Sequence, residues 1–296
     1  MRRVLITGGS GWIGSTLHEA FNDFECLVTY HTHELPNGSG RRLDLCDHQE
    51  IDRLLDVFHP EVILHCAALT SAGQCERQPD LAWSVNAAAT GVLAESAKRL
   101  GAVLIYMSTD LVFDGAGTMW TERDAPRPIS LYGRTKLAGE EAVRNAGGVH
   151  VILRLALCYG RGRYRSQGFT EYMIGQLASG QPVTVFTDQY RTPLFSRDIP
   201  GVVRSLLERG ARGTFHVAGD ERLSRHEFAL ALCDVFELDR HLLRPVSFKT
   251  LPGAASRPAD CSLHNGALRA LGCEFTSLRQ GLSMLRREFE HDDPLR

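Results

Sequence analysis

The chain has 296 residues, of which 43% are hydrophobic and 23% charged, and its formal net charge is -2 at pH 7. This composition predicts a globular protein with one large domain, or a main domain and a smaller appendage, and it argues against a nucleic acid or a membrane surface as the main partner. No apolar run approaches the ~18 residues of a membrane span, and no hydrophobic leader precedes the first predicted strand, so we expect a cytoplasmic protein.

Cysteine and histidine usage argues against disulfides and a metal. The eight cysteines are scattered, contain no C-x-x-C pair and mostly lie in apolar contexts, which predicts buried reduced thiols. His31 and His33 form an H-x-H pair without further ligands nearby, so we expect no metal site.

A glycine-rich turn follows the first predicted strand. The apolar run Val4–Ile6 leads into Thr7–Gly14, and an amphipathic helix continues through Leu17 and Phe21. Glycine lets the backbone approach a pyrophosphate, which would bind free N–H groups at the helix N-terminus. The G-x-x-G-x-x-G spacing is one residue looser than the dinucleotide fingerprint, and an ordinary surface turn remains the alternative. The candidate cofactor residues of this turn are Gly8, Ser10, Gly11, Trp12, Ile13 and Gly14.

The second predicted strand, Glu25–Tyr30, bears on the choice of cofactor. No acidic residue stands at its end to bind a ribose 2′-hydroxyl, as NAD sites require. His31 or His33 could face a 2′-phosphate instead, with Arg41 and Arg42 as more distant candidates. NADP(H) is therefore favoured and NAD(H) is possible, while solvent-facing histidines are an equal alternative.

The next segments predict a short strand and a helix. Arg42–Leu45 reads as the third strand, and its Asp44 and Leu45 are further candidates for cofactor contact. Asp47 opens a capping box for a helix that runs to about Phe58.

Two apolar runs predict strands that are buried on both faces. These runs are Val62–Ala68 and Val103–Thr109, with a long helical segment, Pro79–Leu100, between them. The small Ala67 and Ala68 would let a flat cofactor lie against the end of their strand. Strands that alternate with helices predict a doubly wound parallel α/β sheet of the Rossmann type, with ligands at the carboxyl ends of the strands.

Tyr132 and Lys136 carry the second signal. Four residues apart on a helix, they share a face. A phenol with a pKa of about 10 is a poor acid–base group near neutrality, and a cation beside it stabilises the phenolate. This spacing is common by chance, but together with the glycine turn and a strand that ends in Ser108-Thr109 it favours catalysis.

At this point the sequence resembles a known family. The segments Thr7–Gly14, Ser108–Asp110 and Tyr132-x-x-x-Lys136 are similar to those of the extended short-chain dehydrogenases/reductases. Other segments resemble the dTDP-4-dehydrorhamnose reductase branch, over nearly the whole chain. These segments are Asp110–Gly115, Tyr132–Glu140, Asp188–Pro193 and Arg257-Pro258 before Leu263.

The resemblance implies reduction of the 4-keto group of a nucleotide-linked deoxysugar by NAD(P)H, in polysaccharide or glycoside assembly. Tyr132 would protonate the ketone oxygen, and Lys136 would lower the pKa of Tyr132 and bind the nicotinamide ribose. Thr109, or less favourably Ser108, would donate a hydrogen bond to the developing alkoxide. Asn86 would support a water or backbone network, or be an ordinary polar helix residue.

Several residues are candidates for substrate contact. The basic loop Gly160–Arg165 could clamp a diphosphate or be a solvated loop, whereas Asp188, Gln189 and Arg191 match the family segment. The full set of candidates is Asp110, Arg161, Asp188, Gln189, Arg191 and Arg257.

The sequence also departs from the family. Leu111 stands where rhamnose-forming relatives carry an aromatic residue, and Arg154-Leu155-Ala156-Leu157 stands where they carry Arg-Thr-Ser-Trp. Loss of these rings removes stacking surface and leaves the identity of the sugar open. A non-catalytic NADP-binding regulatory subunit, resembling the methionine adenosyltransferase β subunit, is therefore the alternative. An epimerase is less favoured because of the match at Asp188–Pro193.

We expect residues 1–160 to form the dinucleotide-binding domain, with 183–218 returning to it. Residues 219–296, together with 161–182, would form a smaller C-terminal substrate-binding lobe, and the protein would be a monomer or a homodimer. In the lobe, Ser224 and Glu227 predict a capping box before a helix that ends near Phe236.

Overall fold

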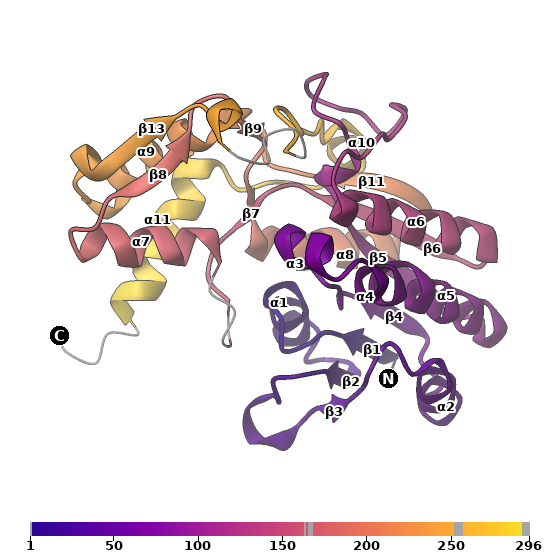
Figure 1. Ribbon diagram of the computed structural model, residues 1–296. Coiled ribbons are helices and arrows are strands. Elements are labelled where there is room, and N and C mark those ends of the chain that lie inside the picture. Colours follow the sequence, from indigo (N-terminus) through magenta and orange to yellow (C-terminus); the bar gives the residue numbers. More distant parts are fainter. Residues whose placement is uncertain (1, 163, 165–167, 252–256, 292–296) are drawn as a thin grey trace.

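The structure is a computed structural model that describes residues 2–162, 164, 168–251 and 257–291 (Figure 1). Its centre is a seven-stranded sheet in the order β11-β6-β5-β4-β1-β2-β3, in which every neighbouring pair runs parallel. The predicted doubly wound parallel α/β fold is confirmed. The strands are β1 (Arg3–Thr7), β2 (Glu25–Tyr30), β3 (Arg41–Arg42), β4 (Val62–His65), β5 (Val103–Thr109), β6 (His150–Leu155) and β11 (Gly213–Val217).

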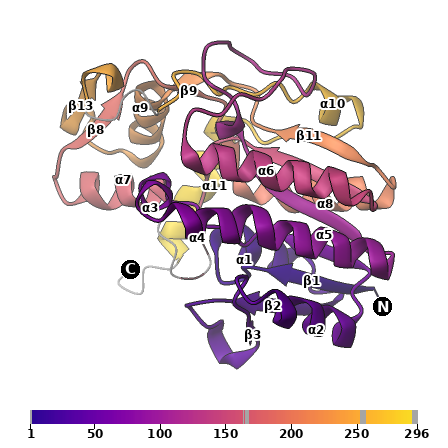
Figure 2. The ribbon, with the colours of Figure 1, turned by 45° about the vertical axis from the view of Figure 1, so that its right-hand side comes forward.

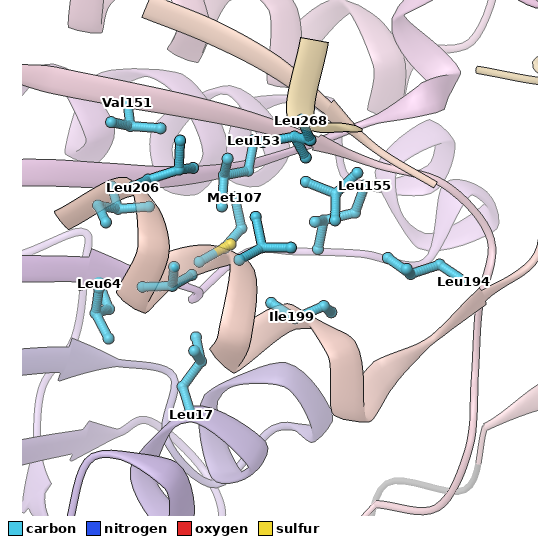
Figure 3. Packing of buried hydrophobic residues seen from close by; sticks show 14 of the residues in the cluster. Leu17, Leu64, Met107, Val151, Leu153, Leu155, Leu194, Ile199, Leu206 and Leu268 are labelled. Atoms are coloured by element: carbon cyan, nitrogen blue, oxygen red, sulfur yellow. The ribbon is translucent and has the colours of Figure 1, made fainter. Parts of the chain in front are cut away.

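Helices cover both faces of this sheet because its strands are apolar on both sides. On one face lie α2 (His48–Phe58), α5 (Ala89–Leu100) and α6 (Leu131–Ala146), the last two side by side in Figure 2. On the other face lie α1 (Trp12–Ala20) and α8 (Ile199–Glu208). Figure 3 shows Leu17 of α1 and Ile199 and Leu206 of α8 among Leu64 of β4 and Met107 of β5.

The strand order fixes where a ligand can bind. From β1 the chain moves outward through β2 and β3, then crosses to β4 on the other side of β1. The connections therefore diverge between β1 and β4, and this divergence opens a crevice at the carboxyl ends of the strands. Thr7 pairs with His65, so that Gly8 and Cys66 leave the sheet at the same level.

A second cluster of apolar side chains lies beside the sheet, on the left in Figure 1. It is built from α7 (Phe169–Ala178), β8 (Val183–Phe186), α9 (Arg225–Phe236), β13 (Leu243–Val246) and α11 (Leu278–His291), with β13 parallel to β8. The division into two domains stays a prediction. Two parts of the chain pack differently from the expected division. Val183 and Val185, expected in the dinucleotide-binding domain, pack in this second cluster. Leu263, Leu268 and Phe275, expected in the smaller lobe, pack against the sheet.

Three expected elements differ in extent. β3 ends at Arg42 instead of Leu45, because the chain turns at Asp44, whose carbonyl and carboxylate accept from the backbone N–H groups of Asp47 and Cys46. β4 ends at His65 instead of Ala68. The segment Pro79–Leu100 consists of α4 (Pro79–Trp83), a π-helical turn (Ser84–Ala88) and α5.

The remaining elements are short. They are α3 (Ala72–Arg77), β7 (Cys158–Tyr159) paired with β10 (Leu194–Phe195), β9 (Tyr190–Arg191) paired with β12 (Leu223–Ser224), and α10 (Gly266–Ala270). Within the described ranges, each helix is too short or too polar to cross a bilayer. All eight cysteines are unpaired, and four of them are buried.

Candidate active site

The glycine turn has the shape of an anion cradle. Gly8 has a φ of +66°, and a Cβ there would lie 2.7 Å from the Cα of Ala67. A Cβ on Gly14 would lie 2.3 Å from the carbonyl oxygen of Gly8. No side chain in the described part of the chain caps α1, so its first N–H groups can bind an anion.

Trp12, the first residue of α1, carries a buried hydrogen-bond donor. Its Nε1 is buried and has no hydrogen-bond partner among the described residues. Its ring fills the space beside Gly168, where a Cβ would lie 2.8 Å away. A buried donor without an acceptor is costly, and an acceptor on a bound ligand would satisfy it. The turn therefore fits a dinucleotide cofactor.

Polar residues gather where the adenosine end of such a cofactor would lie. His31 is exposed at the end of β2, and its Nε2 lies 3.9 Å from the Asp44 carboxylate. Arg42 donates from Nε to the carbonyl oxygen of His31 at 3.3 Å, so Arg42 is closer to this position than we expected. Leu45 is buried in the core, and Ala67 is half-buried just after β4.

A hydrogen-bond chain that the sequence did not predict stands behind the turn. His65 bonds Thr7 through Nδ1 at 2.7 Å and Thr90 through Nε2 at 3.0 Å. Because Thr90 donates to the carbonyl oxygen of Asn86, His65 donates through Nε2 and accepts at Nδ1. Thr7 in turn accepts from the N–H of Ala67. Burial lowers the pKa of His65 to about 3, so the ring is neutral.

Tyr132 and Lys136 lie on the first turns of α6, as predicted. Ser130 caps the helix by accepting from the N–H of Gly133 at 3.1 Å. A Cβ on Gly133 would lie 2.2 Å from the carbonyl oxygen of Leu111, so glycine lets α6 approach the segment that follows β5. This approach brings Tyr132 near Thr109 at the end of β5, close enough for the Thr109 hydroxyl to affect the pKa of the phenol.

The electrostatic surroundings of Tyr132 and Lys136 differ. Burial and the charge of Asp110 raise the pKa of Tyr132, and the neighbouring Thr109 hydroxyl only partly offsets them, so the phenol is protonated at neutral pH. Burial lowers the pKa of Lys136 to about 7, although the charge of Glu140 raises it. Lys136 Nζ lies 4.1 Å above the ring of Tyr106, and no carboxylate in the described ranges forms an ion pair with it.

The structure distinguishes Thr109 from Ser108. Ser108 donates to Glu140 at 2.6 Å, and Glu140 also forms two hydrogen bonds with buried Arg154, at 2.9 and 2.8 Å. The Ser108 hydroxyl is therefore engaged in the core. The Thr109 hydroxyl also donates to a carboxylate, that of Asp110 at 3.0 Å, but it lies near Tyr132 at the end of β5, so Thr109 remains the candidate.

Asn86 lies on the π-helical turn and its side chain is buried. Its amide accepts from the N–H of Leu69 at 2.8 Å and donates to the Leu69 carbonyl oxygen at 3.1 Å and to Thr135 at 3.0 Å. Asn86 therefore joins the loop after β4 to α6, in agreement with the expected supporting role.

Three of the six substrate candidates, Asp110, Gln189 and Arg191, come together, and Arg257 lies on the surface. Asp110 and Arg191 come together as a buried ion pair at 3.2 Å, and Gln189 is buried nearby with its amide donating to the carbonyl oxygen of Pro258. Arg257 is exposed and lines a hollow of about 430 Å³ with Asp114 and other residues.

Two candidates are engaged elsewhere. Asp188 accepts from Ser247 and from the N–H of Phe248, so it fastens the end of β8 to the chain after β13. Arg161 donates to the carbonyl oxygen of Glu288 at 3.2 Å, and its guanidinium lies over Phe289 of α11. Arg163 and Arg165 of the same basic loop lie outside the described residues.

Arg225 is a residue of this region that the sequence did not single out. It is the first residue of α9, and its charge acts on Asp110 and on Arg191. The sequence does contain one feature that could have pointed to Arg225: it is a cation at the start of a predicted helix, where the helix dipole favours an acidic residue.

The comparisons with known proteins agree with this geometry. The family model described as RmlD substrate binding domain matches residues 1–290. Methionine adenosyltransferase 2 subunit beta from Mus musculus is 34% identical over 288 residues, which cover 95% of this chain and 86% of that protein. The probable low-salt glycan biosynthesis reductase Agl14 from Haloferax volcanii is 33% identical over 293 residues, covering 97% of this chain and 98% of that one.

Solved structures show the same fold. The dTDP-4-dehydrorhamnose reductase from Bacillus anthracis, in complex with NADP, superposes with a TM-score of 0.88 at 28% identity, over 97% of this chain and 100% of that chain. The UDP-glucose 4-epimerase from Thermus thermophilus, in complex with NAD, superposes with a TM-score of 0.83 at 24% identity, over 98% and 99% of the two chains.

Proposed function

The chain belongs to the RmlD substrate binding domain family, and we propose that it reduces the 4-keto group of a nucleotide-activated deoxysugar, similar to dTDP-4-dehydrorhamnose, with NADPH preferred over NADH. The observation that carries the proposal is that Tyr132 lies near Thr109, while Lys136 lies on the same helix. Lys136 is close enough to His65 and Cys66, behind the glycine turn, for its charge to act on both side chains. This arrangement offers a proton donor and a cation within reach of a cofactor.

The mechanism follows from what each side chain can do. When bound, a reduced nicotinamide cofactor supplies the hydride. Tyr132 holds its proton because burial and Asp110 raise its pKa, and it delivers that proton to the ketone oxygen. The Thr109 hydroxyl, which donates to Asp110 in the protein alone, would turn to the same oxygen and donate to it as negative charge develops. Lys136 binds the ribose hydroxyls with its ammonium group and stabilises the tyrosinate that is left.

The test is turnover with dTDP-4-dehydrorhamnose, followed by the absorbance of the reduced nicotinamide. We expect oxidation of NADPH that depends on the sugar. Other 4-keto nucleotide sugars serve as a second panel, because Leu111 and Leu157 replace aromatic residues and leave the sugar open. If none of these sugars is reduced with either cofactor while the cofactor binds normally, the proposal is wrong.

Arg42 of β3 supports the preference for NADPH. Its hydrogen bond to the His31 carbonyl oxygen holds a positive charge at the end of β2, where a 2′-phosphate would lie. We expect Arg42→Ala to weaken NADPH binding about tenfold, the effect of one charge-assisted contact with a phosphate, and to leave NADH binding unchanged. Arg41→Ala, the neighbouring residue on the same strand, is the control. Equal losses for both cofactors would show that Arg42 does not read the 2′-phosphate.

The likeness to methionine adenosyltransferase 2 subunit beta favours a second candidate, a non-catalytic NADP-binding regulatory subunit. Capture of a methionine adenosyltransferase catalytic subunit in a stoichiometric complex, without turnover of any 4-keto sugar, would support it. Turnover that depends on Tyr132 would exclude it.

A further inference from the structure

A buried ion pair and a second arginine lie close to Tyr132. Asp110 follows Thr109 directly and is 4% exposed. Its Oδ2 lies 3.2 Å from Arg191 Nε, but no donor in the described ranges forms a hydrogen bond with that oxygen. Arg225 adds a second positive charge, which acts on both Asp110 and Arg191. The cluster therefore has a net positive charge and contains a buried acceptor without a donor.

The position of Arg225 is fixed from two sides. Its N–H donates to the carbonyl oxygen of Gln189 at 3.0 Å, which joins the start of α9 to the segment that carries Arg191. Its guanidinium carbon lies 3.6 Å from the centre of the Phe169 ring, which holds the charge in place. A cation that is held in this way is pre-organised for a ligand.

The electrostatic position of Arg225 is unfavourable in the protein alone. It is the first residue of α9, where the helix dipole repels a cation, and it lies near a second arginine. Burial and the charge of Arg191 lower its pKa to about 9, and Asp110 only partly offsets them. Among the described residues, no acceptor forms a hydrogen bond or an ion pair with its guanidinium. Residues that oppose local electrostatics in this way are typical of binding sites.

We propose that Arg225 binds an anionic group of the substrate, while Asp110 Oδ2 accepts a hydrogen bond from a substrate hydroxyl. The substrate class is then a hydroxylated sugar with an anion close to the reacting carbonyl. The anion is either the diphosphate that links the nucleotide or a carboxylate on the sugar. This inference rests on the proposed function, because the proposed proton donor Tyr132 places the sugar beside Asp110.

Calorimetric titration of the NADP-loaded protein tests the inference with three probes: dTDP, UDP-glucose and UDP-glucuronate. We expect Arg225→Gln to bind dTDP about tenfold or more weakly, because it loses a charge-assisted contact, and Arg225→Lys to restore part of the affinity. If the anion is a sugar carboxylate, dTDP affinity is unchanged. In that case Arg225→Gln loses a preference for UDP-glucuronate over UDP-glucose that the unaltered protein shows.

Arg204→Gln is the matched control. Arg204 also covers an aromatic ring, that of Phe21 at 4.7 Å, but it lies on α8 and pairs with Asp23. We expect this variant to bind the three probes as the unaltered protein does. Thermal unfolding and NADPH affinity of Arg225→Gln separate binding from folding, since a structural role through Phe169 would change the unfolding temperature instead of the probe affinities.

The outcomes also separate this inference from the proposed function. If Arg225→Gln binds every probe as the unaltered protein does, or if the unaltered protein binds none of them, the inference is wrong. If the probes bind through Arg225 but no 4-keto sugar is reduced, the anion site is supported and the reductase proposal fails. Turnover with an unchanged KM in Arg225→Gln would support the reductase and overturn the anion site.

Discussion

Replacing Tyr132 with phenylalanine is expected to lower kcat about 10³-fold, because the substitution removes the proton donor and leaves the ring in place. NADPH affinity should not change, since Lys136 and the glycine turn are untouched. The measurements are kcat with the best 4-keto sugar and the NADPH dissociation constant from a fluorescence titration. Because burial and Asp110 raise the pKa of Tyr132, the donor is protonated throughout the neutral range.

Tyr159→Phe is the control for this substitution. Tyr159 is as deeply buried as the core residues around it, and its hydroxyl has no hydrogen-bond partner within the described part of the chain. Removing that hydroxyl leaves no polar group unsatisfied, so turnover should stay close to that of the unaltered protein. If Tyr132→Phe retained turnover within tenfold, another group would have to donate the proton.

Elements with strong local signals could be predicted from the sequence. The run Val103–Thr109 is apolar and bounded by turn residues, and β5 has these bounds. Ser224 and Glu227 form the predicted capping box, with the serine accepting from the Glu227 N–H and the glutamate accepting from the Ser224 N–H. In these cases the residues that decide the structure are neighbours in sequence.

Elements that depend on tertiary contacts could not be predicted. The π-helical turn Ser84–Ala88 has no pattern of its own, and it places Asn86 where a loop and Thr135 satisfy its amide. β3 is short because Asp44 turns the chain, although the residues that follow Arg42 alternate as in a strand.

The candidate site divides in the same way. Glycines and the Tyr132–Lys136 spacing predict the candidate cofactor and catalytic residues, because each group lies on one turn or one helix. The pairing of Asp110 with Arg191 joins residues far apart in the chain, and the partners of Asp188 and Arg161 come from β13 and α11. The resemblance to the family predicted Asp188 as a substrate contact. The fold shows instead that its carboxylate accepts a hydrogen bond from Ser247.

Lys136→Met is expected to be inactive and more stable than the unaltered protein. The side chain is 2% exposed, and burial lowers its pKa from 10.5 to about 7. The unfolded chain therefore binds a proton at Lys136 between about pH 7 and 10.5, while the folded protein does not. Because the unfolded state binds more protons in this window, the contribution of Lys136 to the free energy of unfolding rises as the pH rises from 7 to 10.5. The destabilisation caused by burying the charged ammonium is therefore fully present below pH 7.

Methionine has a similar length and no charge, so the substitution removes this cost. The pKa difference corresponds to a gain of about 4 kcal/mol in the free energy of unfolding at pH 7, decreasing toward pH 10. Urea unfolding of the cofactor-free protein from pH 6 to about pH 10 measures it. Lys98→Met, at an exposed position on α5, should show no such dependence on pH.

Two results would show that the folded protein does not hold Lys136 at a lowered pKa. In one, Lys136→Met is less stable than the unaltered protein at pH 7; in the other, its free energy of unfolding depends on pH as that of the unaltered protein does. The predicted result would mean that the cation needed beside Tyr132 is kept at the expense of stability, as expected for a residue retained for catalysis.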